Sequence, residues 1–217
     1  MISGSETKQG SHDWLMSRVG KISASRMADL MAKTKTGYGA ARERYASQLI
    51  AERISNRPVS QFISAAMQHG IDTEKEAREF YEGFYECEVK QVGFIEHPNM
   101  AFAGASPDGL VGDDGLLEIK CPETTTYFDV ILYDSPPDKY VLQCQWQMAC
   151  TNTSWCDLMF YDNRVPDEYA HKVFRIFRDE ARIEQLEREV ENFNDEINRR
   201  IGVIDQNLSV VTNVGEP

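Results

Sequence analysis

Apolar residues at three- and four-residue steps predict that the N-terminal part of the chain is helical. The predicted helices cover about residues 23–32, 40–54 and 62–86. Ser23 is placed to cap the first helix, and Gly70 is expected to kink or step the third. Residues 1–12 are polar and are expected to be loose. Residues 34–39, which contain Lys, Thr and Gly, are expected to form a flexible loop.

The pattern then changes to shorter apolar runs, which predict strands over about residues 88–96, 101–111 and 116–121. The sequence Ser-Pro-Pro-Asp at 135–138 is typical of a helix start and predicts a helix that ends near Thr151. Two more strands are expected at about 155–161 and 170–177. This order predicts a single α/β domain in which a mixed central sheet carries helices on both faces.

A last helix is predicted over residues 179–201. Its apolar residues follow alternating three- and four-residue steps: Ile183, Leu186, Val190, Phe193 and Ile197. We expect this stripe to pack on the protein's own core, with packing in a trimer as the alternative.

The composition narrows the class of protein. A chain of 217 residues with 41% hydrophobic residues fits one domain with a real core. There is no apolar run long enough to span a bilayer and no signal-peptide pattern, so a cytoplasmic location is the simplest expectation. The five cysteines suggest no disulfide framework. We interpret Cys144, Cys150 and Cys156 as buried small hydrophobes, with an iron–sulfur cluster that also uses Cys87 as the alternative.

The residues that carry candidate chemistry lie in Ser106-Pro107-Asp108-Gly109-Leu110 and in Leu117-Glu118-Ile119-Lys120-Cys121-Pro122. These segments are predicted to be two short strands joined by a turn. Two carboxylates on neighbouring strands can hold a divalent cation, and a lysine beside them can position a water. This combination favours metal-assisted hydrolysis of a phosphodiester.

The turn decides which side chains share a face. We expect a three-residue loop of Asp113, Asp114 and Gly115, with Gly115 in the left-handed conformation. Residue 110 then faces 118 and residue 108 faces 120, so Asp108, Glu118 and Lys120 project to one side. A two-residue Asp114-Gly115 loop would turn Asp108 to the opposite face.

Several motifs resemble those of lambda exonuclease and the YqaJ-like viral recombinases, a family of the PD-(D/E)XK nuclease superfamily. The resemblance covers about residues 9 to 160, and its motifs occur in the order of that family. They are Gln9-Gly10 with Trp14, Arg18 and Gly20–Ser25, then Gly70–Glu74, Ser106–Gly109, Glu118–Pro122 and Gln143-Cys144-Gln145.

The resemblance implies a PD-(D/E)XK restriction-endonuclease-like core and a Mg²⁺ site. The ligands would be Asp108, Glu118, the backbone carbonyl of Ile119 and Glu74, the last directly or through water. One or two ions would bind, and Mn²⁺ would substitute. Lys120 would orient the attacking water, lower its pKa or stabilise developing charge, and Gln145 would orient Lys120 or the water. His69 is an accessory candidate.

The resemblance also implies a pocket for a DNA 5′-phosphate, formed by Arg18 and Ser25 with the hydroxyl of Ser106. Ser25 is expected in the first turn of a helix, where free N–H groups favour an anion. The family has a further arginine in this pocket. This chain has Thr126 at the aligned position, so it departs from the family's pocket there. Trp14 aligns with a residue that would stack on an unpaired base at the duplex end.

The function implied is Mg²⁺-dependent 5′→3′ digestion of double-stranded DNA ends. The resulting 3′ overhangs would serve a single-strand annealing protein in phage-type recombination. A net charge of −12 argues against broad electrostatic binding of DNA. We therefore expect a ring-shaped oligomer that encloses DNA, by resemblance a toroidal trimer. The alternatives are a structure-specific or endonucleolytic DNase and a non-catalytic DNA-binding protein.

Overall fold

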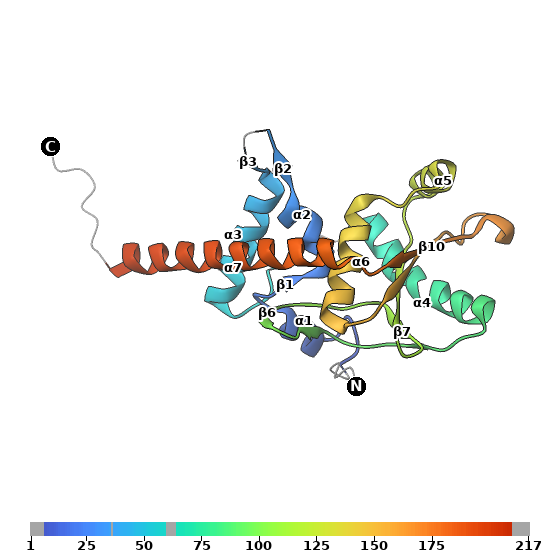
Figure 1. The fold of residues 1–217 in the computed structure, drawn as a ribbon, viewed down its shortest axis with the longest axis horizontal. Coiled ribbons are helices and arrows are strands. Elements are labelled where there is room, and N and C mark those ends of the chain that lie inside the picture. The colour runs from blue at the N-terminus through green and yellow to red at the C-terminus, as the bar shows by residue number, and fades with distance from the viewer. Residues whose placement is uncertain (1–6, 36, 60–63, 210–217) are drawn as a thin grey trace.

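A computed structural model describes residues 7–35, 37–59 and 64–209 of the chain (Figure 1). Its helices are α1 (His12–Arg18), α2 (Met27–Met31), α3 (Ala40–Ser55), α4 (Ala65–Tyr85), α5 (Thr124–Tyr133), α6 (Asp138–Thr151) and α7 (Glu180–Ser209). Its strands are β1 (Ile22–Ser23), β2 (Lys33–Thr34), β3 (Gly37–Tyr38), β4 (Val89–Lys90), β5 (Ile95–His97), β6 (Met100–Ala105), β7 (Gly109–Val111), β8 (Gly115–Lys120), β9 (Trp155–Tyr161) and β10 (His171–Phe177). Short 3-10 turns occur at Ala24–Arg26 and Asp167–Tyr169.

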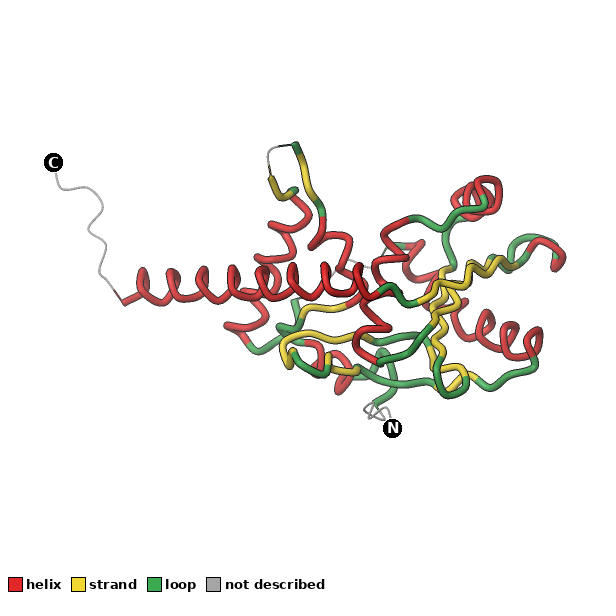
Figure 2. Tube along the Cα trace, viewed as in Figure 1, coloured by secondary structure: helices red, strands yellow, loops and turns green. Residues whose placement is uncertain are grey.

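The central sheet has five strands in the order β10-β9-β8-β7-β4, and only β8 and β9 run parallel. Successive residues of β8 alternate between its two faces. Leu116 packs with α5 and α6 on one face, whereas Leu117 and Ile119 pack with α4 on the other. The predicted α/β fold, a mixed sheet with helices on both faces, is therefore confirmed. The strands lie away from the protruding end of α7 (Figure 2).

Two of the predicted strands are each split into two. The segment predicted at 88–96 forms β4 and β5, and the segment predicted at 101–111 forms β6 and β7. β5 and β6 belong to a separate three-stranded sheet, β1-β6-β5. The second split falls at 106–108, where Pro107 has no N–H to donate to a ladder. The chain therefore crosses between two sheets at the residue before Asp108.

The helices agree with the prediction in place but not always in extent. The helix predicted over 23–32 is a 3-10 turn followed by the short α2, and Ser23 makes no side-chain cap bond. Residues 62 and 63 of the third predicted helix lie outside the described residues. α4 runs through Gly70 as one helix, and α6 begins at Asp138 without a Ser135 cap. α1 and α5 were not predicted.

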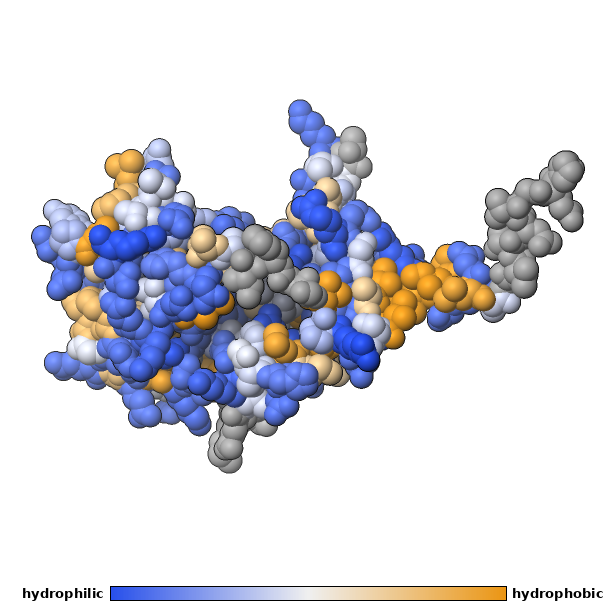
Figure 3. Space-filling view, turned by 180° about the vertical axis from the view of Figure 1, so that it is seen from behind, coloured by the Kyte–Doolittle hydropathy of each residue, from blue (hydrophilic) through white to orange (hydrophobic). Residues whose placement is uncertain are grey.

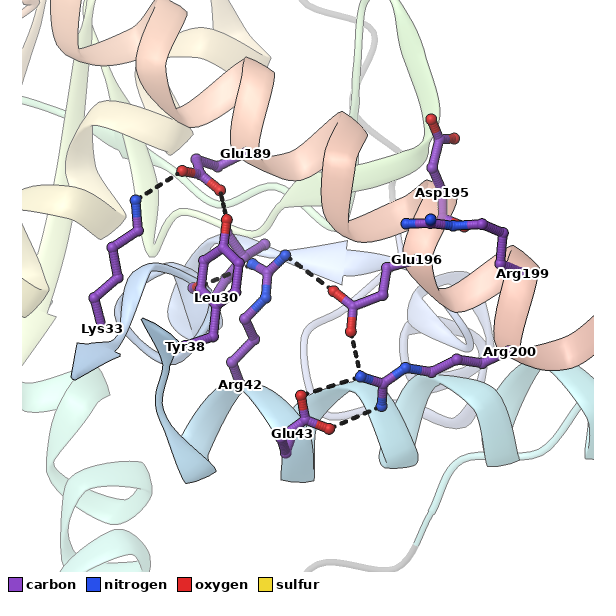
Figure 4. Close-up of polar contacts among 10 residues, drawn as sticks. All are labelled: Leu30, Lys33, Tyr38, Arg42, Glu43, Glu189, Asp195, Glu196, Arg199 and Arg200. Carbon is purple, nitrogen blue, oxygen red and sulfur yellow. Dashed lines mark hydrogen bonds and ion pairs between the residues drawn. The ribbon is translucent and has the colours of Figure 1, made fainter. Parts of the chain in front are cut away.

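The predicted loop at 34–39 is instead part of a small hairpin. Lys33 pairs with Tyr38 across β2 and β3. Glu189 of α7 accepts hydrogen bonds from Lys33 Nζ at 3.0 Å and from the Tyr38 hydroxyl at 2.7 Å (Figure 4). The buried guanidinium of Arg42 lies 3.8 Å from the Tyr38 ring centre and 4.4 Å from that of Phe193. These contacts fasten the hairpin to α3 and α7.

The apolar stripe of α7 packs on the protein's own core, as predicted. Its five residues are at most 2% exposed: Ile183, Leu186, Val190, Phe193 and Ile197. The helix is longer than predicted, however, and ends at Ser209. With a period of 3.6 residues, Ile201, Ile204 and Leu208 continue the same stripe. Leu208 is 81% exposed, and an apolar band follows the protruding part of the helix (Figure 3).

Cys144, Cys150 and Cys156 are buried, and burial raises the pKa of the Cys150 and Cys156 thiols well above the usual range. This placement agrees with their interpretation as small core residues. Over the described part of the chain, no helix is both long and apolar enough to cross a membrane.

Candidate active site

The hairpin of β7 and β8 brings the predicted catalytic residues together, although its register differs from the prediction. Leu110 faces Leu116, and residues 112–114 form the loop. Gly112 has the positive φ of 58°, whereas Gly115 lies in β8. A Cβ on Gly115 would come within 2.1 Å of the Trp155 side chain, so glycine is required there for packing. The pairing shifts by two residues, so the even-numbered residues still share a face.

Asp108 lies at the start of this hairpin and is 9% exposed. Its Oδ2 accepts a hydrogen bond from the backbone N–H of Ile119 at 2.6 Å. Burial raises the pKa of Asp108 well above its usual range, and the charges of Glu118 and Glu74 raise it further. The ionised form of Asp108 is therefore destabilised by too much negative charge in a buried place.

Glu118, 2% exposed, is held by three donors. Its Oε1 accepts from Lys120 Nζ and from Gln143 Nε2, each at 2.6 Å. Its Oε2 accepts from Gln147 Nε2 at 2.5 Å. Both glutamines are on α6, which packs on the face of the sheet that Glu118 points to.

Lys120 stays positively charged in this site. Burial acts to lower its pKa, but the attraction of Glu118 and Asp108 outweighs burial and raises the pKa above its ordinary value. The Lys120 Nζ also lies 4.9 Å from the ring centre of Tyr140. A lysine ammonium at this place can orient a water or stabilise developing negative charge.

The structure corrects the prediction for Gln145. Its Nε2 donates to the Phe177 carbonyl at 2.8 Å, and its Oε1 accepts from the Asp179 N–H at 3.0 Å. Gln145 thus joins β10 to α7 and faces away from Lys120. Residues 143 and 147 are four positions apart and share one helix face, whereas residue 145 lies on the opposite side.

Glu74 lies close enough to raise the pKa of Asp108 and carries a partner of its own. Arg78, one turn later on α4, donates to Glu74 Oε1 at 3.1 Å and to the Asp108 carbonyl at 3.4 Å. His69 is within 3.3 Å of the Thr73 hydroxyl, and its Nε2 is buried without a partner among the described residues. The four-residue spacing of Glu74 and Arg78 is visible in the sequence. It does not reveal that Arg78 links Glu74 to the Asp108 carbonyl.

The predicted phosphate pocket is only partly assembled. Trp14 Nε1 donates to the Ser106 hydroxyl at 3.0 Å, and the Arg18 guanidinium lies 4.1 Å from the Trp14 ring centre. These three residues therefore form one cluster beside Asp108. Ser25 is exposed in a 3-10 turn, with its hydroxyl 3.5 Å from that of Ser23. The expected helix N-terminus is absent at Ser25, because α2 begins two residues later and is only five residues long.

The N-terminal segment also supports the catalytic loop. Gln9 Nε2 donates to the carbonyls of Val92 at 3.1 Å and Pro107 at 2.8 Å. Residues 106, 107 and 108 are thus held in turn by Trp14, Gln9 and Arg78. The segment predicted to be loose is tied down at Gln9.

The chemistry of these residues fits a divalent cation. Asp108 and Glu118 supply buried carboxylate oxygens, the ligand type that Mg²⁺ prefers, and a cation would offset their mutual repulsion. Asp108 Oδ1 is not hydrogen-bonded within the described residues. Within the same residues no three His, Cys, Asp or Glu side chains are grouped to hold a metal ion. Backbone, water or phosphate oxygens would therefore have to complete the coordination.

Comparisons with known proteins agree with this site. The chain matches the YqaJ-like viral recombinase domain over residues 13–154. It is 42% identical to an alkaline exonuclease (LHK-Exo) from Laribacter hongkongensis, whose crystal structure superposes with a TM-score of 0.85 over 92% of this chain and 98% of that one. A crystal structure of LHK-Exo in complex with dAMP gives a TM-score of 0.86 at 41% identity, with the same coverage.

A phage-related exonuclease from Haemophilus somnus 129PT has a TM-score of 0.71 over 85% of this chain and 96% of that one. At 12% identity it supports the fold alone. No curated protein sequence matches the chain. On the family match and the 42% identity, the chain belongs to the YqaJ-like viral recombinase family, whose fold is that of the PD-(D/E)XK nucleases.

Proposed function

We propose that this member of a nuclease family is a Mg²⁺-dependent exonuclease that digests the 5′-ended strand at the ends of double-stranded DNA. The observation that carries the proposal is the set of buried Asp108, buried Glu118 and half-buried Lys120 on one face of the β7–β8 hairpin. The relative LHK-Exo, at 41–42% identity, is an alkaline exonuclease and was also solved with the mononucleotide dAMP. The product would be a 3′ overhang.

Asp108, Glu118 and the backbone carbonyl of Ile119 would hold Mg²⁺, with Glu74 reaching it directly or through water. The ion, when bound, supplies charge neutralisation at the phosphate and a lowered pKa for a nearby water. Mn²⁺ would substitute, with one or two ions per site. Lys120 would stabilise the charge that develops as water attacks phosphorus and the bond to the 3′ oxygen breaks.

Strand polarity would come from the cluster of Trp14, Arg18 and Ser106. Cleavage of the bond to the 3′ oxygen leaves a new 5′-phosphate on the remaining strand. Arg18 could grip this phosphate through two parallel hydrogen bonds, and Ser106 could add its hydroxyl. Ser25 could join only from its exposed turn. Trp14 is held by Ser106 and Arg18 in the free protein, so stacking on a terminal base requires its other face.

Self-association is supported by the outer part of α7. Ile201 and Ile204 continue the core stripe and are half-buried, and Leu208 extends it to a position that is 81% exposed. An apolar band follows this protruding part of the helix (Figure 3). We propose that copies of this chain cover this band in a toroidal trimer that encloses DNA. Enclosure would explain how a chain with a net charge of −12 stays on its substrate. The overhang would be handed to a single-strand annealing protein.

The test is digestion of linear duplex DNA labelled at either 5′ or 3′ termini, with Mg²⁺, beside a covalently closed circle. We expect release of the 5′ label first, no cutting of the circle, and a loss of at least about 10²-fold in rate for Lys120→Ala. Circular dichroism of the variant checks that it is folded. Cutting of the circle would identify an endonuclease instead, and binding without cleavage under any divalent metal would identify a non-catalytic DNA-binding protein.

A further inference from the structure

Gln147 has an unusual environment for a core residue. Its side chain is fully buried on α6, and its Nε2 donates to Glu118 Oε2 at 2.5 Å. Its own Oε1 is also buried, and within the described residues that oxygen has no hydrogen-bond partner. Most buried polar atoms have a hydrogen-bond partner. A buried atom without one costs stability, and it indicates that the residue has a role other than stabilising the fold.

The carboxylate of Glu118 explains the orientation of this amide. If the amide were turned over, Gln147 Oε1 would face a negatively charged oxygen, which is repulsive. The amide therefore gives its donor to Glu118 and leaves its acceptor unsatisfied. An apolar side chain of similar length would remove the unsatisfied acceptor without opening a cavity. It would also leave Glu118 Oε2 without its only donor among the described residues, so the role of the glutamine lies in its bond to Glu118.

The donors around Glu118 are distributed unequally between its two oxygens. Oε1 accepts from both Lys120 and Gln143, whereas Oε2 accepts from Gln147 alone. An ionised carboxylate has about two acceptor positions on each oxygen. The hydrogen bonds thus fill Oε1 and leave one position open on Oε2, with the plane of the carboxylate fixed by donors on both sides.

We infer that Gln147 is a positioning residue that directs the open lone pair of Glu118 Oε2 toward the divalent cation. This role rests on the proposed metal-dependent nuclease function. Gln143 and Lys120 together occupy both acceptor positions of Glu118 Oε1. The two glutamines therefore have different roles, although they are one helical turn apart. Groups that hydrogen-bond to metal ligands commonly alter metal affinity by about 10- to 100-fold when they are removed.

The chain offers a matched control two residues away. Gln145 is also buried on α6, and its amide makes two hydrogen bonds to the backbone, one to the end of β10 and one just before α7. Gln147→Met and Gln145→Met remove the same functional group from the same helix. Only the first removes a donor from Glu118.

The experiment measures Mn²⁺ binding to each DNA-free variant by electron paramagnetic resonance and records thermal unfolding of the metal-free proteins. We expect Gln147→Met to raise the Kd for Mn²⁺ by about 10- to 100-fold, with a cooperative unfolding transition that shows the variant is folded. We expect Gln145→Met to lower the unfolding temperature and to leave the Mn²⁺ affinity as in the wild type.

Two results would overturn the role of Gln147. One is wild-type Mn²⁺ affinity in Gln147→Met, and the other is an equal loss of affinity in both variants, which would indicate a general effect on α6. Either result, with a wild type that binds Mn²⁺ and degrades DNA, leaves the proposed function intact. A wild type that neither binds Mn²⁺ nor degrades DNA would reject both.

Discussion

The catalytic hairpin and the outer part of α7 contrast in what each leaves incomplete. Around Asp108 and Glu118 the polar groups are enclosed, and negative charge is in excess. Along the outer α7 the apolar stripe becomes exposed, from the half-buried Ile201 and Ile204 to Leu208, which is 81% exposed. The first region has fewer positive than negative charges, and the second lacks an apolar cover at its end. Each deficit indicates what should bind: a cation at the hairpin and another copy of the chain at α7.

The largest expected effect comes from removing the buried charge of Asp108. Asp108→Asn keeps an oxygen that can accept from the Ile119 N–H but removes a metal ligand. We expect the nuclease rate to fall by at least about 10²-fold. The metal-free protein should become more stable by about 1–3 kcal/mol, because a poorly compensated buried charge is gone. Activity assays and denaturant unfolding with a chelator measure the two effects.

The pH dependence gives the sign of this effect independently. Asp108 has a higher pKa in the folded protein than the roughly 3.9 of an unfolded chain. The folded state therefore binds this proton more tightly, and wild-type stability is lost as pH rises through the folded pKa. Asp108→Asn should lack this loss. A metal-free Asp108→Asn protein less stable than the wild type at neutral pH would contradict the excess of negative charge.

A charged residue on the α7 stripe tests the second region. Leu208→Asp should convert the proposed trimer to a monomer in light scattering, because an aspartate cannot be buried unpaired in an apolar contact. Val203→Asp is the control, since Val203 is 54% exposed on the same helix but lies off the stripe. Equal masses for Leu208→Asp and the wild type would remove the outer α7 from the assembly interface.

A smaller effect on activity is expected at the cluster of Trp14, Arg18 and Ser106, which lies beside the hairpin. Arg18→Ala should lower the preference for a 5′-phosphate over a 5′-hydroxyl terminus by about tenfold, the equivalent of one charge-assisted hydrogen bond. Initial rates on the two kinds of duplex measure the preference. Arg44→Ala, at an exposed position on α3, is the control. An unchanged preference would place phosphate selection elsewhere.

The sequence predicted the chemistry better than the packing around it. Asp108, Glu118 and Lys120 could be placed on one face because strand alternation survives a two-residue error in register. Gln145 was predicted from the family resemblance alone. Residues 142–151 of α6 are all buried, so the sequence contains no polar face that indicates which glutamine meets the sheet. The predicted strand 101–111 is split before Asp108 because β6 pairs with β1, which is far away in the sequence. A local sequence pattern contains no information on such long-range pairing.

The end of α7 was predictable in part. Ile201, Ile204 and Leu208 continue the spacing of the core stripe, and this spacing is present in the sequence. The point at which α7 leaves the body of the protein depends on tertiary packing. It is set by the end of α3 near Ser55 and by the hydrogen bond from Arg53 to Asn198. The pattern could therefore show an apolar face but not that its last part lies open.

Anomalous diffraction from crystals soaked in Mn²⁺ tests the central claim most directly. We predict a peak within about 2.0–2.3 Å of one oxygen each from Asp108 and Glu118, with the Ile119 carbonyl completing the protein ligands and no such peak in Asp108→Asn crystals. A peak bound by other residues, or full Mn²⁺ occupancy at this place without Asp108, would contradict the assignment of the hairpin as the metal centre.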